Sequence, residues 1–324
     1  MPKPRDPEDD TIPFELRIIF FGTPDFAVSS LATLASSRHE IRAVVAQPDR
    51  PAGRGMKLQS PPVANLAREL GIALIQPAKI RSPETLAWFR EQNADLAVVV
   101  AYGKILSPDL LEIPRLGFIN VHGSLLPKYR GAAPIQRAIE RGETITGVTI
   151  MRIDEELDHG PMLDRVEISI GLDERTPSLA CRLAEEGARL LVSVIDRMES
   201  EGVEEIPQDH DCATYAPKIA KDEGRVDWNR SARAIYDRFR AFWPWPGIFT
   251  EHGGEMIKLV EIAAEGRSGG PPGTVLALGM QGVLIANGDG STRLLEVQRP
   301  GKRAVSAFDY FRSKGLGPGD RFGG

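Results

Sequence analysis

The first 200 residues alternate short apolar segments with helical ones, and this order constrains the fold more than any other feature of the chain. The helical patterns include 61–71 and 82–94, and the second of these opens with Ser82-Pro83, a favoured start for a helix. Strands that are apolar on both faces and separated by helices are typical of a parallel sheet covered on both sides. We therefore predict a Rossmann-like α/β domain. Its expected strands are 16–22, 41–47, 72–77, 95–103, 117–123 and 147–153.

The first expected strand leads into the sequence GTPDF, which begins at Gly22. A dinucleotide site needs the closely spaced glycines of G-x-G-x-x-G to bring the backbone up to a pyrophosphate. Only one glycine is present here, so we expect no NAD despite the Rossmann-like order of elements.

The pattern changes in the second half of the chain. A helix is expected at 176–200, a polar segment without periodicity follows, and a second helix is expected at 231–242. After it come short strands separated by hairpin-like turns, which suggest a small OB-like β-barrel. The predicted organisation is a disordered tail at 1–13, a catalytic domain at 14–204, a linker at 205–220 and a barrel at 221–324.

Composition narrows the class of protein. The net charge is −5, yet residues 221–324 hold 15 basic against 12 acidic side chains, a weak indication of a polyanionic partner. The five histidines show no metal-binding spacing, so no metal site is expected. No apolar run reaches the roughly 18 residues of a membrane span. Two cysteines without a CxxC pair fit the cytoplasm, and Cys181 is expected in the core.

Asn120 and His122 lie at the end of the fifth expected strand, just before Gly123. Alternate residues of a strand share a face, and open α/β sheets bind ligands at the carboxyl ends of their strands. An amide and an imidazole placed together can donate two hydrogen bonds to a developing oxyanion. An Asn-x-His pair is not specific by itself, since such a histidine is often structural. The sequel Ser124-Leu125-Leu126-Pro127 is expected to be an extended loop whose backbone could pair with a planar heterocycle.

Asp158 is the second candidate, within the acidic segment 151–163. That segment could be a solvated loop. Alternatively, Gly160 permits a tight turn that aims the Asp158 carboxylate back into a cleft. A carboxylate beside His122 would orient the ring and stabilise its cationic form.

Together these segments resemble the formyltetrahydrofolate-dependent formyltransferase superfamily: Asn120-x-His122, the SLLP loop at 124–127, and Asp158 thirty-six residues after the histidine. The resemblance implies 10-formyltetrahydrofolate as formyl donor, with Asn120, His122 and Asp158 catalytic and residues 124–127 against the folate. Several acceptors occur in the superfamily, including glycinamide ribonucleotide, amino-sugar nucleotides and methionyl-tRNA.

Two further segments favour initiator methionyl-tRNA as the acceptor. The loop 47–63 carries Arg50, Arg54 and Lys57 and resembles the insertion loop of the tRNA-directed members, although it could simply be a solvated insertion. The C-terminal region, with Lys302 and Arg303, resembles their barrel domain. Trp243 and Trp245 fit either the barrel core or a stacking surface for RNA.

The expected chemistry is the direct attack of the acceptor amine on the formyl carbon. The enzyme is expected to be a monomer. Asn120 and His122 would donate to the formyl oxygen, and Asp158 would hold His122 and help to pass the proton to N10 of the folate. A small amine or water as acceptor, and a non-catalytic RNA-binding protein, remain alternatives.

Overall fold

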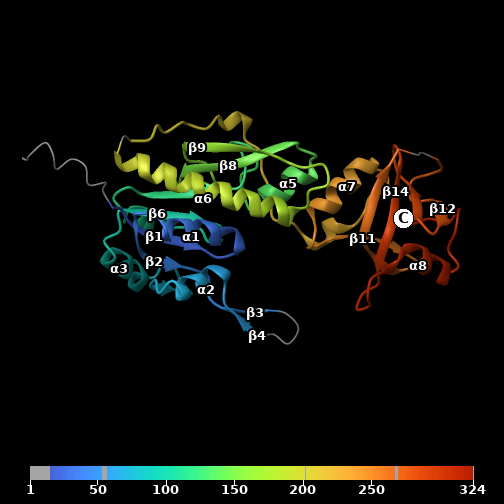
Figure 1. The fold of residues 1–324 in the computed structure, drawn as a ribbon, viewed down its shortest axis with the longest axis horizontal. Coiled ribbons are helices and arrows are strands. Elements are labelled where there is room, and N and C mark those ends of the chain that lie inside the picture. Colours follow the sequence, from blue (N-terminus) through green and yellow to red (C-terminus); the bar gives the residue numbers. More distant parts are fainter. Residues whose placement is uncertain (1–14, 53–56, 201, 267–268, 324) are drawn as a thin grey trace, which may run out of the picture. The chain divides into compact units, whose positions relative to one another are not determined.

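The computed structural model describes residues 15–52, 57–200, 202–266 and 269–323, so the tail expected at 1–13 lies outside the described residues (Figure 1). The chain divides into two compact units. The first unit comprises residues up to Arg130, Gly147–Ile168 and Ala180–Thr214. The second comprises Gly131–Thr146, Ser169–Leu179 and the chain from Tyr215 onward.

A seven-stranded sheet forms the first unit, in the order β5-β2-β1-β6-β7-β8-β9. The ladders that join β5, β2, β1, β6 and β7 are parallel, which confirms the Rossmann-like prediction for this part of the sheet. The strands are β1 (Arg17–Gly22), β2 (Glu40–Val45), β5 (Leu74–Ile75), β6 (Leu96–Val100), β7 (Phe118–His122), β8 (Ile145–Arg152) and β9 (Met162–Ser169).

β8 departs from the expected parallel sheet, because it pairs antiparallel with β7 and places His122 opposite Thr149. Six of its eight residues are buried, and a strand buried on both faces has the same apolar pattern in either direction. As a result, the chain leaves β8 beside the beginning of β7 rather than beside its end.

Helices cover the sheet on both faces. On one face, the Phe21 ring packs against Phe118 of β7 and Phe89 of α3. On the other, a Cβ at Gly187 of α6 would lie only 3.1 Å from Val121 Cγ1 and Val148 Cγ1, so glycine lets this helix approach β7 and β8 closely. These helices are α1 (Val28–Ala35), α2 (Pro62–Glu69), α3 (Pro83–Glu91), α4 (Pro108–Leu111) and α6 (Thr176–Ser200).

Cys181 is exposed on α6, so its expected place in the core is wrong. The buried stripe of this helix runs through Leu179, Leu183 and Gly187, four residues apart. Cys181 lies off that stripe because side chains two positions apart point in different directions on a helix.

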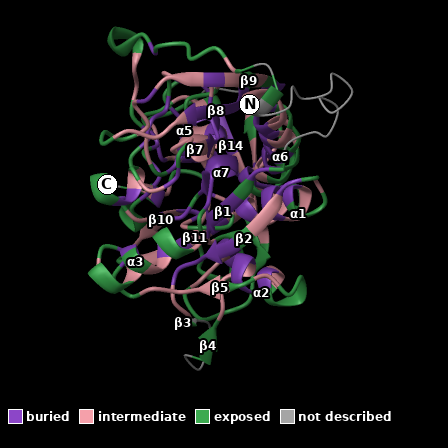
Figure 2. Ribbon diagram, turned by 90° about the vertical axis from the view of Figure 1, so that its left-hand side faces the viewer, coloured by how far each residue is buried: buried purple, intermediate pink, exposed green. Residues whose placement is uncertain are grey.

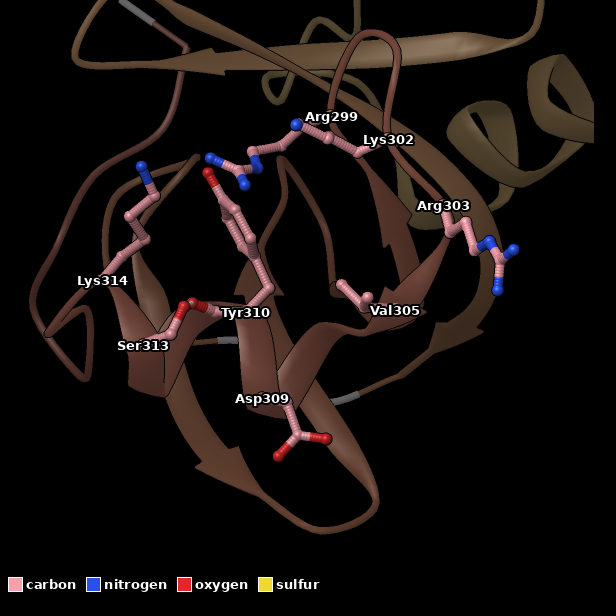
Figure 3. A pocket seen from close by; sticks show the side chains of 8 residues that line it. All are labelled: Arg299, Lys302, Arg303, Val305, Asp309, Tyr310, Ser313 and Lys314. Carbon is pink, nitrogen blue, oxygen red and sulfur yellow. Dashed lines mark hydrogen bonds between the residues drawn. The ribbon is translucent and has the colours of Figure 1, made fainter.

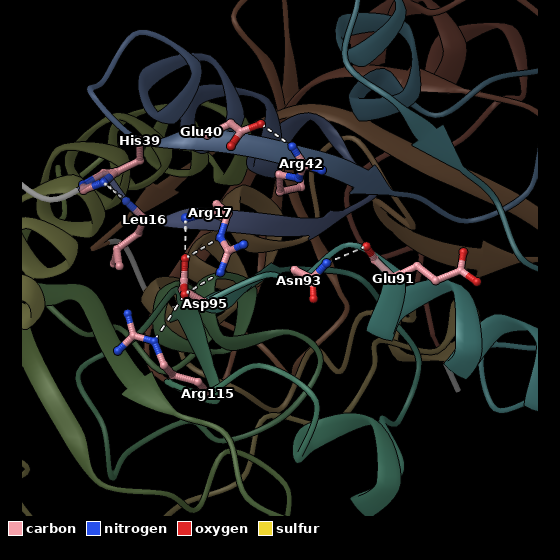
Figure 4. Close-up of polar contacts among 9 residues, drawn as sticks. All are labelled: Leu16, Arg17, His39, Glu40, Arg42, Glu91, Asn93, Asp95 and Arg115. Carbon is pink, nitrogen blue, oxygen red and sulfur yellow. Dashed lines mark hydrogen bonds and ion pairs between the residues drawn. The ribbon is translucent and has the colours of Figure 1, made fainter.

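An ion cluster joins the beginnings of β1 and β6 (Figure 4). Asp95 accepts hydrogen bonds from the Arg17 backbone N–H at 3.0 Å, from its Nε at 3.0 Å and from its Nη2 at 3.2 Å, and a further one from Arg115. The Arg17 hydrogen bond lowers the pKa of the Asp95 carboxyl from 3.8 to about 2. The cluster therefore favours a charged carboxylate at the edge of the core.

The basic loop expected at 47–63 is partly regular. β3 (Arg50–Ala52) and β4 (Lys57–Gln59) form a two-stranded antiparallel hairpin. At its base the Asp49 carboxylate accepts hydrogen bonds from Gln76 and Ser60, which lower its pKa. The β4 strand is exposed along its whole length (Figure 2).

The second unit contains a six-stranded sheet that runs β10-β11-β14-β13-β12, with β15 beside β14. All its ladders are antiparallel, as the hairpin-like turns of the sequence imply, and the described ladders do not join β10 to β12. The strands are β10 (Ile248–His252), β11 (Glu255–Glu265), β12 (Val275–Gly279), β13 (Gly282–Ala286), β14 (Ser291–Gln298) and β15 (Val305–Ser306). The helices are α5 (Pro134–Glu140), α7 (Ala232–Ala241) and α8 (Ala307–Ser313).

Trp243 and Trp245, both in the second unit, differ in environment. Trp243 is half-buried, with the Arg175 guanidinium 4.8 Å from its ring centroid, and Trp245 is 57% exposed. Arg175 in turn forms an ion pair with Glu261 at 2.6 Å. Trp243 therefore belongs to a packed cluster, whereas Trp245 offers an open aromatic face.

No helix in the described ranges combines the length and the apolar character needed to cross a membrane.

Candidate active site

The site is built on the carboxyl end of β7. Strand alternation places Phe118, Asn120 and His122 on one face, and Phe118 belongs to the buried cluster beneath that face. Asn120 is half-buried, and within the described ranges its side-chain amide makes no hydrogen bond. His122 is 5% exposed. The amide is therefore available to a ligand beside a buried imidazole.

Asp158 reaches this imidazole from the loop between β8 and β9. Its Oδ2 lies 3.6 Å from His122 Nδ1, and the two side chains are 14% and 6% exposed. The loop folds back tightly, because a Cβ at Gly160 would lie 2.3 Å from the carbonyl oxygen of Arg152. The predicted approach of carboxylate and ring is thus present, and Gly160 contributes through close backbone packing.

A main-chain contact decides which protons the imidazole can offer. His122 Nε2 lies 3.0 Å from the carbonyl oxygen of Tyr129. A carbonyl can only accept, so Nε2 carries a proton and donates it. In the neutral ring Nδ1 is then an acceptor, and a second proton on Nδ1 gives an imidazolium facing Asp158. His122 can therefore donate to a ligand through Nδ1 only when both ring nitrogens carry a proton.

The segment bends at Ser124 and enters a turn that covers 126–129, so 124–127 is not the extended loop that was expected. The Leu126 N–H donates to Thr149 Oγ1 at 3.2 Å, and the Thr149 hydroxyl donates to the Ser124 carbonyl at 2.7 Å. The Ser124 hydroxyl donates to the Lys128 carbonyl. The Ser124 hydroxyl and carbonyl and the Leu126 N–H, which were expected to be free for a heterocycle, thus form hydrogen bonds within the protein. The contact of Ser124, Leu125, Leu126 and Pro127 with folate stays a prediction.

The basic residues expected to contact nucleic acid fall into two groups. In the first unit Arg50 and Lys57 are exposed on the β3–β4 hairpin, while Arg54 lies outside the described residues. In the second unit Lys302 and Arg303 line a concavity of about 540 Å³ (Figure 3). The two groups occur in different units.

The concavity of the second unit contains cations that the sequence did not single out. Arg299 and Lys314 line it, and both are ion-paired with Glu255, at 3.5 and 2.9 Å. Lys302 and Arg303 are exposed and form no ion pair with the described residues. Their charges are therefore available to a polyanion, with Tyr310 as an aromatic wall. Lys314 directly follows α8. Its four-residue spacing to Tyr310 in that helix could have indicated that the two side chains lie on the same face.

The side chains of the described residues limit which metal ion or ligand the site can hold. Among the described residues, no cluster of histidine, cysteine and carboxylate side chains is arranged to hold a metal ion. The donor set at β7, an open amide and a ring that can become an imidazolium, fits an oxygen on which negative charge develops. The site is thus equipped for attack on a carbonyl carbon.

The chain belongs to the formyl transferase family. The formyl transferase model matches residues 16–195, and the model of the formyl transferase C-terminal domain matches residues 218–315. The methionyl-tRNA formyltransferase of Geobacter metallireducens is 46% identical over 95% of this chain and 99% of its own length. That of Myxococcus xanthus is also 46% identical, over 94% of this chain and 97% of its own.

A solved structure shares the fold. HypX from Aquifex aeolicus, crystallised in complex with tetrahydrofolic acid, superimposes with a TM-score of 0.61 at 19% identity. The match covers 94% of this chain and 48% of HypX, so the chain spans about half the length of that protein. At this level of identity the likeness concerns the fold alone.

Proposed function

We propose that this chain transfers the formyl group of 10-formyltetrahydrofolate to the amino group of methionyl-tRNA. One observation carries the choice of acceptor: the methionyl-tRNA formyltransferase of Geobacter metallireducens matches 95% of the chain at 46% identity. Asn120, His122 and Asp158 supply the catalytic groups. 10-Formyltetrahydrofolate, when bound, supplies the electrophilic formyl carbon.

The residues at β7 act on the formyl oxygen. The Asn120 amide and the Nδ1–H of the His122 imidazolium donate hydrogen bonds to this oxygen as the methionyl amine attacks and negative charge builds, with the Nδ1–H shared between this oxygen and Asp158 Oδ2. Loss of one such donor costs roughly 10²–10³ in rate. Asp158 stabilises the imidazolium and takes part in moving the proton released by the amine to N10 of the folate. The C–N bond to the methionyl amine forms, and the bond from the formyl carbon to N10 breaks.

The domains and the substrate-contacting residues are assigned as follows. Residues 14–204 act as the catalytic domain, 205–220 as the linker and 221–324 as the tRNA-binding domain. Ser124, Leu125, Leu126 and Pro127 border the folate. Arg50, Arg54, Lys57, Lys302 and Arg303 contact tRNA phosphates. Because a single chain carries groups for both substrates, we expect a monomer in the cytoplasm, where initiator tRNA is used.

A formylation assay tests the proposal. The full-length protein is incubated with 10-formyltetrahydrofolate and methionyl-tRNA, and N-formylmethionine is quantified after the ester is hydrolysed. Uncharged tRNA and free amino sugars serve as control acceptors, and formate is measured in parallel. We expect N-formylmethionine only with the charged tRNA. Formylation of the amino sugar instead, or release of formate without any acceptor, would assign the site to another reaction.

A further inference from the structure

One short segment, 208–214, contacts the supports of both His122 and Asp158. It lies within the first unit and contains a 3₁₀ turn at His210–Cys212. Gln208 is 4% exposed and Thr214 is half-buried. Nothing in the polar, aperiodic sequence of this region indicates a role in a site.

Gln208 holds the backbone that carries the carboxylate. Its Nε2 donates to the carbonyl of Asp158 at 3.0 Å and to the carbonyl of Gly160 at 2.7 Å. Asp158 has a φ of +50°, in the left-handed region that favours glycine. A single side-chain amide therefore bridges two carbonyls across a strained residue, and the direction of the Asp158 side chain follows from this backbone.

A buried arginine fixes the orientation of the Gln208 amide. The Nε and Nη2 of Arg130, which is 3% exposed, donate to Gln208 Oε1 at 3.1 and 2.7 Å. A guanidinium can only donate, so Oε1 faces it and Nε2 must face the two carbonyls. Arg130 also donates to Nδ1 of His210, whose ring stacks on His159 with centroids 4.1 Å apart. The loop is thus held to the 208–214 segment at a second point, directly after Asp158.

The other end of the segment supports His122. The Thr214 hydroxyl oxygen accepts the N–H of Tyr129 at 2.9 Å, and the Thr214 carbonyl accepts the N–H of Arg130 at 2.8 Å. Tyr129 also has a left-handed backbone, with a φ of +64°. Its carbonyl is the acceptor that fixes the proton on His122 Nε2. Both left-handed residues that support the pair are therefore bonded to the same short segment.

We infer that Gln208 and Thr214 are positioning residues, which hold the Asp158 carboxylate and the His122 ring in register for the proposed formyl transfer. This inference rests on the proposed function of that pair. It does not require either residue to touch a substrate.

The test separates donation by Gln208 from its packing. Gln208→Glu keeps an oxygen for Arg130 and loses the donor to the two carbonyls, and Thr214→Val keeps the shape and loses the acceptor. Gln92→Glu is the matched control, because Gln92 Nε2 donates to the Trp88 carbonyl at the end of α3. We expect kcat to fall by about tenfold or more in each test variant, with KM for both substrates within about twofold. The control should keep wild-type kinetics.

A double-mutant cycle with Asp158→Asn distinguishes positioning from general damage. If Gln208 acts through the carboxylate, adding Gln208→Glu to Asp158→Asn lowers kcat no further. A further tenfold loss in the double variant, or wild-type kcat in folded Gln208→Glu and Thr214→Val, overturns the inference. Thermal unfolding of each variant reports whether it is folded. Failure of the proposed function has a different signature: the wild type would form no N-formylmethionine, or Asp158→Asn would be fully active.

Discussion

His122 Nδ1 faces Asp158 Oδ2 at 3.6 Å while His122 Nε2 donates to a main-chain carbonyl, so the two ring nitrogens have different partners. Under the proposed function, this division assigns the carboxylate to the proton on Nδ1. Asp158→Asn should therefore lower kcat by roughly 10²-fold or more, as expected for loss of acid–base function. Steady-state formylation measures kcat, and binding of methionyl-tRNA should stay within about twofold. If tRNA binding collapsed while the fold was intact, Asp158 would belong to the binding surface instead.

The Asn120 amide makes no hydrogen bond to the described residues, so a ligand can use it. Removing this amide should disturb the surrounding packing little. Asn120→Ala should reduce kcat by roughly 10²–10³-fold, the usual cost of losing one oxyanion donor. The unfolding midpoint should hardly change, since the amide bonds to no described residue. Single-turnover kinetics separates the chemical step from product release. An unchanged chemical rate would contradict the proposed donor role.

Gly160 should tolerate no side chain. In Gly160→Ala the new Cβ would meet the Arg152 carbonyl at 2.3 Å, which forces the loop and its carboxylate to move. We expect kcat to fall by roughly tenfold or more, by analogy with the large cost of small misplacements. Gly279→Ala is a suitable control, because its Cβ would meet nothing within 4 Å. Equal activity of the two variants would show that the loop position does not matter.

The Asp95 cluster predicts a specific pH dependence of stability. Since the pKa of Asp95 is lowered to about 2 in the folded chain, its contribution is complete above the unfolded pKa near 3.8. It is lost as the pH falls from there towards 2. Asp95→Asn should reduce the free energy of unfolding by roughly 1–2 kcal/mol at pH 7 and by progressively less below pH 4. Urea unfolding at pH 7 and pH 3 measures the difference. A gap that widened at pH 3 would have the wrong sign.

Lys302 and Arg303, which form no ion pair with the described residues, should act through charge alone. Lys302→Ala/Arg303→Ala should raise KM for methionyl-tRNA, leave kcat unchanged and reduce the dependence of binding on salt concentration. Arg42→Ala/Arg90→Ala removes the same charge from exposed positions of the first unit and serves as control. Identical salt slopes for the wild type and the Lys302/Arg303 variant would remove these two residues from the tRNA-binding surface.

The sequence predicted the regular parts of the fold well, because each depends on a local pattern. The first strand, expected at 16–22, is found at Arg17–Gly22, and the helix expected at 176–200 is confirmed. The direction of β8 could not be predicted, since a doubly buried strand has no directional signature. The bent path of 124–127 depends on Thr149, which is distant in sequence and bonds both Ser124 and Leu126.

The approach of Asp158 to His122 was predicted from motif and spacing, and the structure brings the two together. The catalytic roles stay predictions. Gln208 and Thr214 were not found, because each acts on main-chain atoms of another segment and leaves no periodic or compositional signal. The predicted linker at 205–220 stays a prediction about how the domains are joined. Its residues Gln208 and Thr214 nevertheless bond to the 129–130 and 158–160 segments.

The acceptor for the His122 Nε2 proton is part of the main chain of Tyr129, and this has a consequence for mutational scanning. Exchanging the aromatic ring leaves the acceptor in place, and glycine or asparagine accommodates its dihedral angles readily. A library of side-chain replacements would thus score position 129 by how well the ring packs, and would overlook its part in proton placement. Only chemistry that alters the peptide link itself, such as an ester or thioamide introduced by semisynthesis, would expose that part.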